Sequence, residues 1–314
     1  MLSIDHVLFP TDFSDGARRA FPQAAFLADW HDATLHILNV TGRHRHDYQA
    51  AKDQFPIPPH TLSAWMGRSP QDASGPAEGP DLSALPIVQE QIESARPAET
   101  ILAYADDNDI DLVVMGTHGR RGVDRMLFGS VTEEVVRKVA CPALTVRADA
   151  EAAPGQAVRR LLVPIDFSDA SGVAIDHAKE IALTYGAEID LLHVVDEPTF
   201  PAAYGDDLAR FPTEEVLDRV ETQLATMARN DIGYEHVQVA ARTGSPAGVI
   251  LDYIDEKDID FVVIASHGRT GLDRMLLGSI TERVLRRSPT PVFVVKPTQK
   301  SLVSGRPAAT AASE

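Results

Sequence analysis

The chain has 314 residues, of which 44% are hydrophobic, and its formal net charge is −17 at pH 7. General affinity for nucleic acid or anionic membranes needs clustered Lys and Arg, so this charge argues against both partners. We find no apolar run of membrane-spanning length and no signal peptide at the N-terminus, and therefore expect a cytoplasmic protein without membrane insertion. The single cysteine, Cys141, excludes an intramolecular disulfide and is expected to be a buried bystander.

The length predicts about two domains of roughly 150 residues each, and the order of elements agrees. Continuously apolar strands separated by helices indicate parallel sheets covered by helices on both faces. In the first half the predicted strands are His6–Pro10, 35–40, 87–94, 111–115 and 143–147, with helices at 15–30, 97–106 and 131–139. In the second half the predicted strands include 161–164, 190–195, 234–241 and 292–296, with helices ending near Tyr185 and at 213–230 and 245–256. We therefore predict an α/β chain with two repeated domains, each a five-stranded parallel sheet.

The predicted domains are 1–148 and 158–297, and they differ between the second strand and the core motif. The first carries a Pro- and His-rich insertion at about 41–85, with part of a helix near 48–55 or 62–66. The second has a helical spacing there, with Val216, Val220, Leu224 and Met227 expected to point inward. Residues 148–158 read as a linker, and 298–314 as a flexible tail.

One stretch occurs twice. Residues 110–138 and 259–287 align without a gap at an offset of 149, and 18 of the 29 positions are identical. Such a period is the length of a whole domain, so the repeat indicates duplication and not a solenoid.

This repeated stretch combines a strand, a glycine turn and the start of a helix. Glycine accepts positive φ and lets a ligand approach the backbone. Ser130 is expected to be the N-cap of its helix, whose unpaired amides and dipole favour an anion. A purely structural alternative is a capping box, Ser130 with Glu133 and Ser279 with Glu282. Asp12 and Asp166 could likewise be turn residues or caps.

The spacing Gly116-x-x-Gly119, nine residues, then Gly129-Ser130 resembles the ATP-binding signature of the universal stress protein family, and Pro10-Thr-Asp12-Phe-Ser14 resembles that family's opening. Both halves match. The resemblance implies a tandem member with two Rossmann-like units related to adenine-nucleotide alpha-hydrolase folds, and ligands beyond the carboxyl ends of the strands.

The resemblance also implies roles for individual residues. In the first half it places Asp12 by the base and ribose, with Pro10 and Val40 lining the cleft. The turn and the phosphate cradle would comprise Met115, Gly116, Gly119, Gly129, Ser130 and Val131. The matching residues are Pro164, Asp166, Val194, Ile264, Ala265, Gly268, Gly278, Ser279 and Ile280. Because Ala265 replaces Gly116, we rank the first site above the second. Arg120 and its neighbours could add phosphate contacts or form a solvated loop.

The resemblance implies ATP as the cofactor, bound with or without Mg²⁺. We therefore expect a nucleotide-responsive regulatory protein that acts in stress protection. The chain has no GxxxxGK[ST] motif and no poised general base, so ATP hydrolysis is expected to be slow at most. A nucleotide-free interaction scaffold and a slow ATPase or phosphotransferase are the alternatives.

The family's habit of pairing through the last strand implies that the final strands of the two halves pack together within one chain, as a pseudo-dimer. A further homodimer stays open. The run 43–46, with two Arg and two His, is interpreted as a solvated loop and not a metal site.

Overall fold

The computed structural model describes residues 2–42, 54–66, 80–117, 129–147, 158–196, 214–268, 277–297 and 300–303. The first half contains β1 (His6–Pro10), α1 (Asp15–Trp30), β2 (Thr34–Thr41), α3 (Pro59–Trp65), β3 (Ile87–Glu93), α4 (Pro97–Asp107), β4 (Leu112–Gly116), α5 (Ser130–Lys138) and β5 (Ala143–Val146). The second contains β6 (Arg160–Pro164), α6 (Asp169–Tyr185), β7 (Glu188–Val195), α7 (Glu214–Met227), a π-helical turn (Ala228–Ile232), β8 (Val237–Thr243), α8 (Pro246–Glu256), β9 (Phe261–Ala265), α9 (Ser279–Arg287) and β10 (Val292–Val295).

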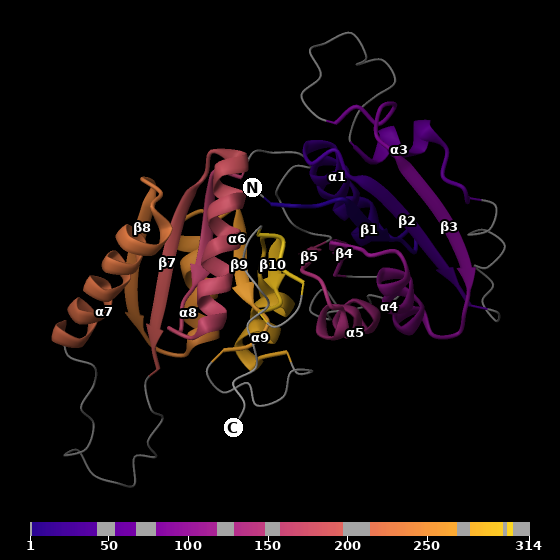
Figure 1. Ribbon diagram of the computed structural model, residues 1–314. Coiled ribbons are helices and arrows are strands. Elements are labelled where there is room, and N and C mark those ends of the chain that lie inside the picture. The colour runs from indigo at the N-terminus through magenta and orange to yellow at the C-terminus, as the bar shows by residue number, and fades with distance from the viewer. Residues whose placement is uncertain are drawn as a thin grey trace, which may run out of the picture.

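All ten strands belong to one sheet, in the order β3-β2-β1-β4-β5-β10-β9-β6-β7-β8 (Figure 1). Each half contributes five parallel strands, which confirms the predicted α/β class. The halves meet where β10 pairs antiparallel with β5, in the register Val292↔Thr145, Phe293↔Leu144 and Val294↔Ala143. The two repeats are therefore continuous through backbone hydrogen bonds.

Two apolar layers cover the sheet, one on each face. The first lies under α1, α3, α6 and α7, and contains Phe9, Phe21 and Phe293. The second lies under α4, α5, α8 and α9, and contains Val113, Val135 and Val294. Phe293 and Val294 are neighbours in β10 yet belong to opposite layers, as the side-chain alternation of a strand requires. Both layers cross the junction between the halves.

The helix predictions agree closely where the structure describes the chain. Ser14 caps α1, and the helix considered near 62–66 in the insertion matches α3. Residues 48–53 of the other placement lie outside the described residues. On α7, Leu224 is buried, and Val220 and Met227 pack against the core, but Val216 is 38% exposed, so its predicted inward position is wrong. Helical spacing identifies a face of a helix, not the turn at which packing begins. The first residues of the predicted 234–241 strand also differ, because Tyr234 precedes β8 and donates its hydroxyl to Ala187 O at 2.8 Å.

Residues 300–303, which lie within the predicted tail, contact the first half. Lys300 Nζ lies 2.6 Å from Asp111 Oδ1 and donates to Asp109 O at 2.8 Å. Asp111 Oδ2 also accepts the amides of residues 5 and 6, so the same carboxylate holds the start of β1. Leu302 is 1% exposed, and Leu2 forms a β-bridge with Val303. Residues 148–157 and 304–314 lie outside the described residues.

His177 on α6 joins this C-terminal segment to the second half. Its Nδ1 lies 2.8 Å from Val173 O, and its Nε2 lies 3.2 Å from the Leu302 amide nitrogen. A carbonyl only accepts and an amide only donates, so Nδ1 carries the proton and Nε2 must be unprotonated. Burial lowers the pKa of His177 below its usual 6.5, although Val173 O and Glu180 act the other way.

This arrangement predicts a pH dependence of stability. A His whose pKa is lower in the folded state than in the unfolded state contributes stability above pH ~6.5 that is lost as the pH falls below that value. We expect the free energy of unfolding to decrease from pH ~7.5 to ~5, and His177→Gln to reduce that decrease. Denaturant unfolding at several pH values measures this pH dependence of stability. Exposed His60→Gln should retain the wild-type dependence. An unchanged dependence in His177→Gln would contradict the assignment.

Candidate functional site

The predicted site residues of the first half that the structure describes lie at the carboxyl ends of β1, β2 and β4 and at the start of α5. Thr132 Oγ1 donates to Gly116 O at 2.9 Å, and the Gly129 amide donates to Thr117 O at 2.7 Å. These bonds hold the start of α5 against the end of β4. The second half repeats both bonds, from Thr281 Oγ1 to Ala265 O at 2.8 Å and from the Gly278 amide to Ser266 O at 2.7 Å. The sequence did not single out the two threonines, although both occupy the third position after the glycine.

The predicted serine caps are wrong. Gly129 and Gly278 are the N-caps of α5 and α9, and neither helix has a side-chain capping bond. Ser130 and Ser279 are each the first helical residue and are exposed. The glycine backbone is extended, with φ of −62° in both, so each helix starts one residue earlier than a serine cap requires. The capping-box alternative is thereby removed, and the helix starts are open to an external acceptor.

Other helix starts differ from these two. Ser14 and Ser168 cap α1 and α6 through their hydroxyls. The helices α4 and α8 begin with proline, which removes one amide donor. Among these six helices, only α5 and α9 begin with Gly-Ser, without a capping side chain and without proline.

Asp12 and Asp166 serve as turn residues, as the structural alternative predicted. Asp12 Oδ1 accepts the Ser14 amide at 3.0 Å, and Asp166 Oδ1 accepts the Ser168 amide at 3.0 Å. Asp166 Oδ1 also accepts the Ser171 hydroxyl at 2.6 Å. A Cβ on Gly268 would overlap Asp166 Oδ2, so the turn after β9 lies against this carboxylate. Both aspartates are half-buried, and Asp166 lies beside Gly268.

Phe13 and Phe167, which the sequence analysis missed, follow these aspartates with left-handed backbones. Both have φ of 62°, a conformation that costs a non-glycine residue about 1–2 kcal/mol. Strained residues of this kind gather at binding sites, where the surrounding structure holds them. Their identical φ in the two copies shows that the Asp-Phe-Ser turn is a shared feature of both halves.

The remaining predicted residues fall into three groups. Met115 and Ile264 are each 5% exposed and pack in the core, so only their backbone can face a ligand. Val40, Val131 and Val194 are partly buried against the same layer, whereas Ile280 is 38% exposed. Pro10 is buried and Pro164 half-buried, both at strand ends. Gly119, Arg120 and the other loop arginines lie outside the described residues, as do residues 43–46.

Gly116 has a structural reason to be glycine. A Cβ there would overlap the backbone of Gly16, at the start of α1. The second half has alanine at both matched positions, 170 and 265, so its α6 and β9 accommodate two methyl groups. Ala265 therefore fits helix packing, and its methyl group gives no separate reason to rank the second site below the first. The ranking stays a prediction.

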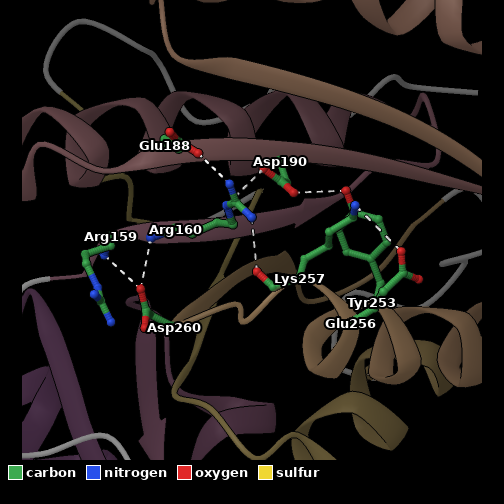
Figure 2. A network of polar contacts seen from close by, with 8 residues as sticks. All are labelled: Arg159, Arg160, Glu188, Asp190, Tyr253, Glu256, Lys257 and Asp260. Carbon is green, nitrogen blue, oxygen red and sulfur yellow. Dashed lines mark hydrogen bonds and ion pairs between the residues drawn. The ribbon is translucent and has the colours of Figure 1, made fainter.

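A second polar cluster lies at the opposite end of the second half (Figure 2). Arg160 Nη2 donates to Glu188 Oε2 at 2.7 Å, and Tyr253 Oη donates to Asp190 Oδ2 at 2.9 Å. Burial raises the pKa of Asp190, which is 1% exposed. Asp260 Oδ2 accepts the amides of Arg159 and Arg160, as Asp111 does in the first half. These bonds hold the amino ends of strands together.

The first half fills the matched positions with His6, His36 and Tyr104. His6 Nδ1 lies 3.1 Å from His36 Nε2, and His36 Nδ1 lies 3.0 Å from Tyr104 Oη. Burial, and then the neighbouring His6, lower the pKa of His36. The same place in the two halves is thus polar with different chemistry, which indicates structural cross-links at the end of the sheet opposite the glycine turns.

Comparison with known proteins follows the same division of the chain. The model of the universal stress protein family matches residues 3–147 and 157–296. The chain belongs to the universal stress protein family. A universal stress protein of Mycolicibacterium smegmatis is 33% identical over 216 residues, which cover 67% of this chain and 69% of that protein.

Two solved structures that cover nearly the whole chain support the universal stress protein fold. A universal stress protein from Archaeoglobus fulgidus covers 93% of this chain and 98% of its own, with 20% identity and a TM-score of 0.59. The protein PA1789 from Pseudomonas aeruginosa covers 94% and 93%, with 17% identity and a TM-score of 0.64. A universal stress protein in complex with cAMP covers 45% of this chain, with 24% identity and a TM-score of 0.35.

Two further sequence predictions concern Cys141 and membranes. Cys141 is 2% exposed, which confirms the predicted burial, and this burial raises the pKa of its thiol to about 12. Within the described part of the chain, no helix is long and apolar enough to cross a membrane. The same residues contain no group of three or more His, Cys, Asp and Glu that could hold a metal ion.

The packing around Gly116 makes a stability prediction. We expect Gly116→Ala to lower the free energy of unfolding by about 1–3 kcal/mol, because the methyl group forces α1 away from β4. Gly278→Ala is the matched control, since its Cβ would lie 3.4 Å from the nearest atoms and should cost about 1 kcal/mol or less. Denaturant unfolding of both variants measures the difference. Equal losses would contradict the packing explanation.

Proposed function

We propose that this universal stress protein binds ATP at the carboxyl edge of its sheet and acts as a nucleotide-responsive regulatory protein. The observation that carries the proposal is the start of α5 and α9. Each begins with Gly-Ser beside the end of a strand, without a side-chain cap. A phosphate placed there accepts hydrogen bonds from the unpaired backbone amides and interacts favourably with the positive end of the helix dipole.

The residues proposed to contact the nucleotide are those inferred from the family resemblance. Asp12 and Asp166 each follow the first strand of their half, and both carboxylates accept the amide of the serine two residues on. Ser130 and Ser279 are free of a capping role and exposed, so their hydroxyls can contact a phosphate. Mg²⁺ would accompany the phosphates as part of the ligand.

The alternative is a nucleotide-free interaction scaffold. It is favoured by the packing of Gly116 on Gly16, which explains that glycine without a ligand. It leaves the uncapped Gly-Ser helix starts unexplained. In either case we propose that the antiparallel β5–β10 contact makes the chain a pseudo-dimer, and that it works in the cytoplasm during stress.

Charge at the helix start tests the ATP site. Aspartate suits the first turn of a helix, so Ser130→Asp and Ser279→Asp should fold, while their carboxylates repel phosphate. We expect each to weaken its own site about tenfold or more, with Ser130→Asn and Ser279→Asn binding close to wild type. Calorimetric titration of ATP with Mg²⁺ measures this, with cAMP as a second ligand.

The outcomes separate the hypotheses. Absence of ATP binding to the wild type would sink the nucleotide proposal and favour the scaffold. Equal binding by all variants would place the phosphates elsewhere. Phosphate release that Ser130→Asp removes would support a slow ATPase.

A further inference from the structure

Arg286 links the two helices that the proposed function assigns to phosphate binding. It lies in the last turn of α9, and its Nη2 is 2.9 Å from Glu133 Oε2 on α5. The same Nη2 is 2.9 Å from Glu282 Oε1, and its Nε donates to that oxygen at 3.0 Å. One guanidinium therefore forms ion pairs with a carboxylate from each half.

Both carboxylates lie in the first turn of their helices. Glu133 is the fourth residue of α5, and Glu282 is the fourth residue of α9. A carboxylate there opposes an incoming phosphate through like-charge repulsion. Arg286 offsets this repulsion at both helix starts at once. The side chains are 28–41% exposed, so solvent screens the contacts only in part.

The opposite ends of these helices are also held across the junction. Lys296, at the end of β10 and 6% exposed, donates through Nζ to the carbonyls of Val136 and Arg137 in α5. Arg147, at the end of β5, donates to Arg287 O of α9 at 3.3 Å. Cations suit helix C-termini because of the dipole. Each helix thus contacts the other half at its last turn, so displacement of one disturbs contacts in both.

We propose that Arg286 couples the two nucleotide sites negatively, so that an anion at one helix start weakens anion binding at the other. This inference rests on the proposed function for its ligand. An anion at α5 draws the guanidinium toward Glu133 and away from Glu282. The carboxylate of Glu282 then opposes an anion at α9 more strongly, and the reverse holds by linkage.

Charge variants test the coupling with ATP. Ser279→Asp places a permanent negative charge at the start of α9, and Ser279→Asn is its neutral control. The first site is identified as the one whose affinity Ser130→Asp lowers. We expect Ser279→Asp to weaken ATP binding there by about two- to fivefold relative to Ser279→Asn. Arg286→Gln should abolish this difference, whereas Arg283→Gln, an exposed arginine on the same helix, should retain it.

A ligand-free measurement separates the coupling from the proposed function. We compare the melting temperatures of Ser130→Asp, Ser279→Asp and the double variant. With Arg286 present, the double variant should melt about 1–3 °C below the additive expectation, because two charges compete for one guanidinium. With Arg286→Gln the two effects should add.

The results divide cleanly. Additivity in both backgrounds, or equal first-site affinity in Ser279→Asp and Ser279→Asn, would overturn the coupling. Non-additivity together with absent ATP binding would support the electrostatic link and overturn the proposed function instead.

Discussion

The antiparallel pairing of β5 with β10 is the contact on which the rest of this universal stress protein depends. Each half alone would end in an unpaired strand, an edge that exposes backbone donors and acceptors. Pairing the two edges satisfies these groups, and the residues of β5 and β10 are buried on both faces. The apolar layers then run through the junction without interruption. The remaining edges of the sheet are β3 and β8.

This junction also determines where the helix starts lie. The helices α5 and α9 precede the paired strands, so the pairing brings them close enough for Arg286 to reach Glu133. The threonine hydroxyls and glycine amides fix each start against its glycine turn. The two helix starts that we propose to bind phosphate are therefore linked by a side-chain contact across the junction.

Much of the fold could be predicted from the sequence because strand and helix patterns are local. β1 was placed at its observed bounds, and the duplication revealed two equivalent halves. Predictions that required a choice between two adjacent residues were harder to make from the sequence. The serine caps were wrong because Gly129 and Gly278 also serve as caps, and a sequence cannot show which residue is extended. The packing of Gly116 on Gly16, the docking of residues 300–303 and the reach of Arg286 all join residues distant in the chain, and no local pattern encodes them.

Hydrogen exchange distinguishes a protein that binds nucleotide at the starts of α5 and α9 from a nucleotide-free scaffold. Amide exchange is compared in wild-type protein with and without ATP and Mg²⁺. We expect slower exchange in peptides covering 129–138 and 278–287, with β3 and β8 unchanged, because bound phosphate accepts hydrogen bonds from the helix amides and protects them. Unchanged exchange in both helices at saturating ATP would contradict nucleotide binding at these helix starts.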